Sequence, residues 1–188
     1  MNFYDNKLFE KIDYKAVALE KAAYESCVFR NCDFSDTDFC DFSFIDCQFE
    51  SCNLSMIKIG NTTFNNIQFV NCKMLGLRFE HCNPFLFEVN FNGCYLHLAS
   101  FYKMKLKKSL FANCELHEVD FTEADLTEAK FENCDLKAAV FEFTTLLKTD
   151  FRTSYNYSIH PESNKIKKAR FSQQGIAGLL YRYDIVIE

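Results

Sequence analysis

An apolar residue returns at every fifth position of this chain between Leu19 and Phe151. We call it the central residue of each five-residue unit. The pattern runs from Leu19 to Phe79 and again from Phe91 to Phe151, and no central residue is polar. An α-helix repeats about every 3.6 residues and a β-strand about every 2, so neither element produces a period of five. A short regular period is typical of a solenoid, in which similar units stack on one another.

The residue two positions before each central residue is mostly small, with Cys, Ala, Thr and Val recurring there. We call these residues the small row. A large residue beside a small one fills a narrow interior without voids, so both rows are predicted to face inward. Phe42 is the clear exception in the small row and predicts a local bulge or local repacking.

A period of twenty residues lies on top of the period of five, because similar side chains recur after every four units. This spacing predicts a four-sided tube with successive coils about 4.8 Å apart. The predicted core includes Phe29, Phe49, Phe69, Phe91, Phe111, Phe121 and Phe131, together with Cys32, Cys52, Cys72, Cys94, Cys114 and Cys134.

Units such as Ala124-Asp125-Leu126-Thr127-Glu128 place a small residue, a polar residue and then Leu or Phe in order. This arrangement resembles the pentapeptide-repeat family. The resemblance implies an all-β solenoid, a right-handed quadrilateral β-helix, with a short helical C-terminal cap. The expected organisation is an N-terminal cover over residues 1–14, the repeat β-helix over 15–153 with a phase break at 80–90, and a C-terminal cap over 154–188.

The phase break contains two more residues than the pattern requires, within 80–88, and Pro84 favours a kink there because it fixes φ and lacks a backbone donor. Two interpretations stay open. The insertion is either a tolerated change of length or an irregularity that faces a partner, since loops on rigid scaffolds often carry function.

After residue 153 the pattern stops, and Pro161 favours a helix over 161–168. Ser172 is a suitable N-cap for a second helix over 173–182, and residues 183–188 read as a short strand. A solenoid end needs a cap, and a strand with a free edge can pair with a second copy. We therefore expect a cap that is also a homodimer surface, with candidate residues Ile176, Leu179, Leu180, Tyr183, Ile185 and Ile187.

Nine of the ten cysteines, all but Cys40, fall in the small row or, as Cys82 does, continue its spacing into the phase break, and free thiols there behave as small apolar groups. No CxxC pair is present, so structural thiols and a reducing cytoplasm are expected. The sequence has no apolar run long enough for a membrane span, and its beginning lacks the order of a secretory signal.

Charge is segmented along the chain, although the net value is only -5. Residues 25–54 and 111–135 are strongly acidic, and the segment between them is basic, with a cluster at Lys103, Lys105, Lys107 and Lys108 that we call the basic waist. Ordinary surface patchiness explains part of this pattern. Alternatively, carboxylates at regular spacing imitate the phosphates of a duplex, which carries one charge about every 1.7 Å of its axis.

Within the family, the layout of two runs, a phase break, Phe- and Cys-rich units and a helical tail is similar to the Qnr, MfpA and McbG branch. That resemblance implies a dimeric, DNA-shaped protein that engages DNA gyrase or topoisomerase IV and protects it from quinolones or toxins. The chain departs from the branch in lacking long projecting loops. By this analogy, the candidate partner-binding acids are Asp36, Asp38, Asp41, Asp46, Glu118, Asp120, Glu123, Asp125 and Glu128.

Two other functions remain open, a general protein-interaction scaffold and a nucleic-acid binder that uses the basic waist. An enzyme is not expected, because a Phe-filled tube offers no substrate pocket and no catalytic motif is present. His97 and His117 are twenty residues apart and are expected to stack outward, where a weak metal pair is conceivable. Accidental stacking is the favoured interpretation, so the sequence predicts no metal ligands, no cofactor and no direct contact with membrane or nucleic acid.

Overall fold

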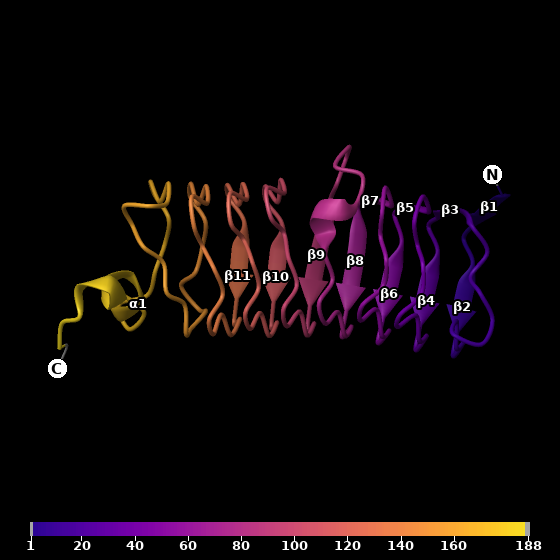
Figure 1. Cartoon of the computed structure of the whole chain (residues 1–188), viewed down its shortest axis with the longest axis horizontal. Helices are drawn as coiled ribbons and strands as arrows, with labels where there is room; N and C mark the ends of the chain where they lie inside the picture. Colours follow the sequence, from indigo (N-terminus) through magenta and orange to yellow (C-terminus); the bar gives the residue numbers. More distant parts are fainter. Residues whose placement is uncertain (1, 187–188) are drawn as a thin grey trace.

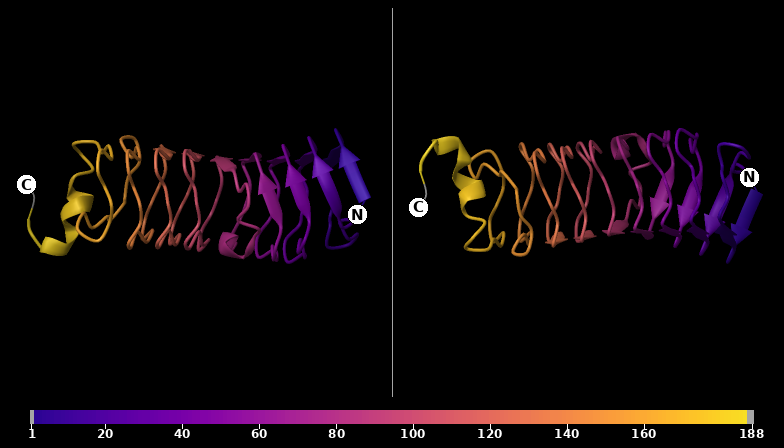
Figure 2. Two further views of the ribbon diagram at one scale, coloured as in Figure 1. Left: turned by 90° about the horizontal axis from the view of Figure 1, so that it is seen from above. Right: turned by 90° about the horizontal axis from the view of Figure 1, so that it is seen from below.

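The computed structural model describes residues 2–186, which form a rod of stacked coils with the two termini at opposite ends (Figure 1). The predicted fold class is confirmed, since about seven turns of a parallel β-solenoid are followed by one short α-helix. Seven strands form a sheet along one side of the rod: β2 (Leu8–Glu10), β4 (Val28–Arg30), β6 (Gln48–Glu50), β8 (Ile67–Val70), β9 (Val89–Asn92), β10 (Leu110–Ala112) and β11 (Lys130–Glu132). A second sheet, confined to the N-terminal half (Figure 2), contains β1 (Asn2–Asp5), β3 (Ala22–Glu25), β5 (Ser43–Ile45) and β7 (Thr63–Asn65).

Strands pair in parallel with the equivalent residues of the next coil, so that Phe9 lies opposite Phe29 and Phe29 opposite Phe49. The other two sides carry isolated bridges, many with the same offset of twenty residues. The pairing extends beyond the expected repeat region at both ends. Strands β1 and β2 already pair with β3 and β4, and Asp150 bridges Arg170.

The central residues form the core as predicted. Every central residue from Tyr24 to Phe151 is at most 2% exposed, whereas Leu19 is only partly buried. Aromatic rings of successive coils stack in columns, and rings on adjacent sides meet edge to face. Such contacts add to the stabilisation that comes from burial alone.

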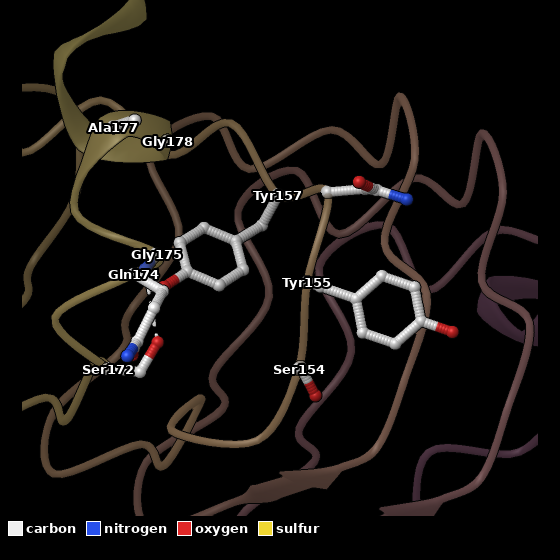
Figure 3. A pocket seen from close by; sticks show the side chains of 9 residues that line it. Ser154, Tyr155, Tyr157, Ser172, Gln174, Gly175, Ala177 and Gly178 are labelled. Carbon is white, nitrogen blue, oxygen red and sulfur yellow. Dashed lines mark hydrogen bonds between the residues drawn. The ribbon is translucent and has the colours of Figure 1, made fainter. Parts of the chain in front are cut away.

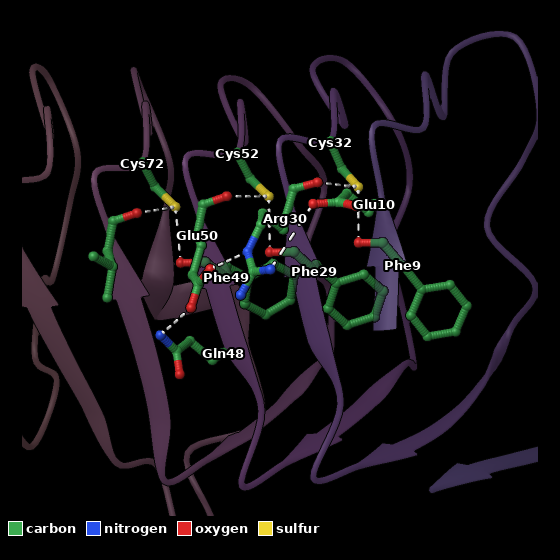
Figure 4. Close-up of polar contacts among 11 residues, drawn as sticks. Phe9, Glu10, Phe29, Arg30, Cys32, Gln48, Phe49, Glu50, Cys52 and Cys72 are labelled. Atoms are coloured by element: carbon green, nitrogen blue, oxygen red, sulfur yellow. Dashed lines mark hydrogen bonds and ion pairs between the residues drawn. The ribbon is translucent and has the colours of Figure 1, made fainter. Parts of the chain in front are cut away.

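The small row contributes hydrogen bonds as well as volume. Cys52 Sγ donates to the carbonyl of Phe29 at 3.3 Å, and Cys72 makes the same contact with Phe49 (Figure 4). Thr144 repeats it through its hydroxyl, which lies 2.9 Å from the Phe121 carbonyl. The small row therefore favours Cys, Thr and Ser because they are small and carry a donor. Burial also raises the pKa of Cys47 to about 12, so this thiol stays protonated.

Two inward positions depart from the regular pattern. Phe42 is accommodated by repacking and not by a bulge, because Ala22 and Thr62 leave room for its ring one coil below and above, and its carbonyl keeps its ladder bond to Thr63. Val17, expected to face inward, is 64% exposed because the chain between Tyr14 and Ala22 departs from the regular coil.

The phase break is a projecting loop (Figure 1). A 3₁₀ turn, η1 (Phe79–His81), precedes it. Before the loop, equivalent residues of successive coils are still twenty positions apart: the Asn83 N–H donates to the Thr62 carbonyl, which is the ladder bond of Asn83 beside Thr63. After the loop they are twenty-two positions apart, since Val89 pairs with Ile67. The two extra residues therefore lie between these points, where Phe85 and Leu86 are exposed and Phe87 packs on Phe79.

The C-terminal segment differs from the sequence prediction. Residues 161–168 form a turn and another solenoid unit, not a helix, because Asn164 takes a small-row position and Ile166 packs against the core. The predicted helix over 173–182 is reduced to α1 (Ala177–Leu180) and the 3₁₀ turn η2 (Tyr181–Tyr183). Residues 184–186 form no strand, since Asp184 has a φ of 49°.

The corners of the coil require an unusual backbone conformation. The residue two positions after the central residue has a φ near +50° to +65° along most of the rod, as at Asn61, Leu98 and Phe143. This left-handed region suits Asn, Asp and Gly, but costs other L-residues about 1–2 kcal/mol.

We therefore expect Phe143→Asn to raise the free energy of unfolding by about 1 kcal/mol. Phe143 has a φ of 54° and is 70% exposed, so its ring contributes little packing in return for the strain. Chemical denaturation measures the change. The matched substitution Val140→Asn, at an exposed ladder position without positive φ, should bring no such gain, and equal effects at both positions would contradict the explanation.

Candidate functional site

The interior is filled by side chains, so binding surfaces lie on the outside of the rod. One hollow of about 330 Å³ lies between the last coils and the C-terminal segment (Figure 3). Tyr157 is buried there, and a side chain at Gly175 would collide with its hydroxyl, so this position requires glycine. The described residues that line the hollow include no carboxylate, imidazole or thiol, the groups on which acid–base and nucleophilic chemistry usually depends.

Eight of the nine candidate acids repeat the same positions of the coil in two groups. Bridges connect Arg78, Ser100 and Asp120 in one column, and Asp38 bridges Lys58 in the same column further down. The two groups are therefore four coils apart, about 19 Å, and face the same way. The matched pairs are Asp36 with Glu118, Asp38 with Asp120, Asp41 with Glu123, and Asp46 with Glu128.

The columns between the two groups are not acidic. Lys58 and Arg78 separate Asp38 from Asp120, and exposed Met56 and Leu98 lie in the column of Asp36 and Glu118. The structure therefore presents two acidic clusters at equivalent positions of the rod, and not a continuous row of carboxylates. In each cluster three acids lie on or at the corners of the side that carries Phe39 and Phe121, whereas Asp46 and Glu128 lie at the next corner.

Several candidate acids are paired with lysines of a neighbouring coil. Lys103 Nζ lies 3.5 Å from Glu123 Oε2, and Lys107 Nζ lies 3.2 Å from Asp125 Oδ2. The other two pairs are Lys148 with Glu128, at 2.6 Å, and Lys21 with Asp41, at 2.7 Å.

Hydrogen bonds from these lysines lower the pKa of Glu128 and of Asp41. Exposed ion pairs of this kind contribute only about 0–1 kcal/mol to stability, but they reduce the charge that a partner meets.

Five candidate acids have no ion-pair partner among residues 2–186. Hydrogen bonds from the Cys40 side chain and backbone lower the pKa of Asp38, and Asp46 accepts a hydrogen bond from Asn66 at 2.6 Å. Residue types alone do not separate the paired acids from the unpaired ones, although the spacing of twenty residues places Lys103 and Glu123 in one column. The unpaired acids are Asp36, Asp38, Asp46, Glu118 and Asp120.

The candidate dimer residues divide into two groups. Leu179 packs against the core and therefore belongs to the cap itself, and Leu180 is half-buried. Ile176, Tyr183 and Ile185 are between 46% and 56% exposed, so their apolar surface is available at the end of the rod. Ile187 lies outside the described residues.

A rod of repeated five-residue units, with a filled interior and functional groups confined to its surface, is a solenoid scaffold. Two family models match it, one described as "Pentapeptide repeat region" over residues 85–157 and one as "Pentapeptide repeats (8 copies)" over residues 27–66. Because these matches together span more than half of the sequence, the chain belongs to the pentapeptide-repeat family.

Among solved structures, the chain is similar in fold to QnrB1, a plasmid-mediated fluoroquinolone resistance protein. One trypsin-treated point variant of QnrB1 is 20% identical, with a TM-score of 0.62 and coverage of 100% of this chain and 92% of that one. A second trypsin-treated point variant is also 20% identical, with a TM-score of 0.50 and complete coverage of both chains. At this identity the likeness establishes the shared fold.

Comparison with curated protein sequences finds no match. Within residues 2–186, no helix is long and apolar enough to cross a membrane.

Proposed function

We propose that this protein is a non-catalytic DNA mimic that binds DNA gyrase or topoisomerase IV and protects the enzyme from quinolones or toxins. The observation that carries the proposal is the repetition of one acidic cluster at equivalent positions of the rod, four coils apart. Its fold is shared with QnrB1, whose described role is fluoroquinolone resistance. This partner places the protein in the cytoplasm.

The proposal includes a homodimer formed through the C-terminal end. Ile176, Tyr183 and Ile185 expose apolar surface beside α1, at the outer end of the cap. Dimerisation there would double the length of the rod and place a second pair of acidic clusters along it. Sedimentation of the full chain, compared with an Ile176→Ser/Ile185→Ser variant, measures this step.

A gyrase supercoiling assay, with and without a fluoroquinolone, tests the function. The purified chain should protect gyrase from the drug. A variant that neutralises four unpaired acids, D36N/D38N/E118Q/D120N, should require at least about tenfold more protein, because it loses charge that no lysine offsets.

The matched control is D150N/R152Q, which removes an acid outside the candidate set together with the arginine that lies 2.7 Å from it, and so leaves the net charge unchanged. It should protect like the wild type. Equal protection by the neutralised variant would contradict mimicry through the acidic clusters, and no effect of the wild type on either topoisomerase would refute the proposed partner.

The alternative is an interaction scaffold with a different partner. The observation that favours it is the loop at the phase break, where Phe85 is 71% exposed and Leu86 is 60% exposed. If the wild type has no effect on either topoisomerase, a pull-down from the host would identify the other partner. Phe85→Ser should then abolish capture of that partner, whereas the acid-neutralised variant should retain it. By contrast, the lysine-based nucleic-acid hypothesis is weakened, because Lys103 and Lys107 lie beside carboxylates.

A further inference from the structure

Two histidines and two carboxylates meet on the side of the rod that carries Leu96, Leu116 and Leu136 in its interior. Tyr95, Glu115 and Asp135 form one ladder column on this side, each residue one coil beyond the last. His97 and His117 occupy the column two residues further along, so each histidine lies diagonally beneath the carboxylate of the next coil.

The side chains of this cluster approach closely. His97 Nε2 lies 3.0 Å from Glu115 Oε2, and His117 Nε2 lies 2.9 Å from Asp135 Oδ2. The two imidazole rings stack with centroids 4.5 Å apart and planes 21° apart. The ligand atoms that His97, Glu115 and His117 offer all lie within 4.8 Å of one another.

These distances suit one small cation. Zinc binds imidazole nitrogen and carboxylate oxygen at about 2.0–2.2 Å, so two ligand atoms on a tetrahedral ion are about 3.4 Å apart. The His97–Glu115 separation is already shorter than this. The remaining adjustment is a small rotation of half-exposed side chains, and a hollow of about 260 Å³ beside His97 and Tyr95 leaves room for it.

The surroundings keep the ligands available. Nε2 of His117 is buried, and because its contact with Asp135 lacks hydrogen-bond geometry, it has no hydrogen-bond partner among the described residues. The Asn156 side chain donates a hydrogen bond to Oδ1 of Asp135 at 2.8 Å, which leaves Oδ2 of this carboxylate beside His117. The next residue in the column of the two histidines is Lys137, which is not a metal ligand.

We propose that His97, Glu115 and His117 bind one divalent transition-metal ion, with Zn²⁺ as the best match, and that Asp135 supports His117 or completes the coordination. Imidazole and carboxylate ligands together favour this class of ion over Mg²⁺ or Ca²⁺, which prefer oxygen alone. The ion would link two successive coils, because His97 lies on one coil and Glu115 and His117 lie on the next. The two histidines alone suggested accidental stacking, and the structure adds the carboxylates from the neighbouring column.

Isothermal titration calorimetry of the full chain with Zn²⁺, without a histidine tag and after treatment with a chelator, tests the site. One Zn²⁺ per chain is expected. H97A and E115Q should each weaken binding at least about tenfold, and H97A/H117A should abolish it. H81A, which removes an exposed histidine elsewhere on the rod, is the matched control and should bind like the wild type.

Absorption of the Co²⁺-loaded protein identifies the ligands independently. Imidazole and carboxylate ligation gives visible bands without the thiolate charge-transfer band that Cys40 would produce. Because the substituted side chains face outward, circular dichroism should show the same fold in every variant. Failure of the wild type to bind, unchanged affinity in H97A/H117A, or a thiolate band would each overturn the assignment.

Discussion

Phe121→Ala is expected to lower the free energy of unfolding by about 3–5 kcal/mol. Phe121 is fully buried, and its ring stacks between those of Phe101 and Phe141, with centroids 5.4 Å and 5.1 Å away. It also meets Phe111 and Phe131 edge to face on the adjacent side. Because the ladder hydrogen bonds fix the coil spacing, the neighbouring coils cannot close onto the cavity. Urea denaturation followed by circular dichroism measures the loss.

The matched substitution is Thr122→Ala, one residue further along the same coil. Its side chain is partly exposed and outside the aromatic columns, so the change should stay within about 0.5 kcal/mol. If the two variants lost similar stability, the assignment of Phe121 to the interior and of Thr122 to the surface would be incorrect.

Asn164→Ala is expected to cost about 2–4 kcal/mol, a large effect for the loss of one polar side chain. Asn164 is buried, and its amide donates to the carbonyls of Phe141 and His160 at 2.8 Å and 2.9 Å. Its oxygen accepts a hydrogen bond from the Thr144 N–H at 2.8 Å. Alanine would leave these backbone groups without partners in a region that water enters poorly.

Asn65→Ala provides the comparison, since Asn65 faces outward from β7 and its side chain makes no hydrogen bond among the described residues. Thermal denaturation should show a clear decrease in Tm for Asn164→Ala and little change for Asn65→Ala. A small effect at Asn164 would mean that the last coil is not held by this side chain.

The sequence predicts the regular part of this fold well, because each unit repeats the same inward pair. Phe121 and Cys134 are assigned to the core from spacing alone, and both are buried. The coil around Asn164 and Phe171 was missed, because an irregular stretch separates it from the main pattern, although Ala169-Arg170-Phe171 still carries the signature of a unit.

The candidate surface is harder to predict, because its properties depend on which side chains become neighbours across coils. The pairing of Lys103 with Glu123 follows directly from the twenty-residue offset. By contrast, the contacts of His97 with Glu115 and of Lys107 with Asp125 join residues eighteen apart, on a diagonal that depends on the direction of each side chain.

Strand pairing keeps successive coils at the same distance, so the number of coils fixes the distance between two surface groups along the rod. Each coil contacts only its neighbours, so removing or adding twenty residues between Asp46 and Glu118 would change the separation of the acidic clusters by one step of about 4.8 Å, without altering either cluster. By contrast, the chain pairs with the preceding coil both before and after the loop at Pro84. The two extra residues of this loop therefore change the surface of the rod without changing its length. The distance between the clusters and the shape of the surface can therefore change independently in this architecture. A partner that contacts both clusters would be affected by an added coil but not by a longer loop.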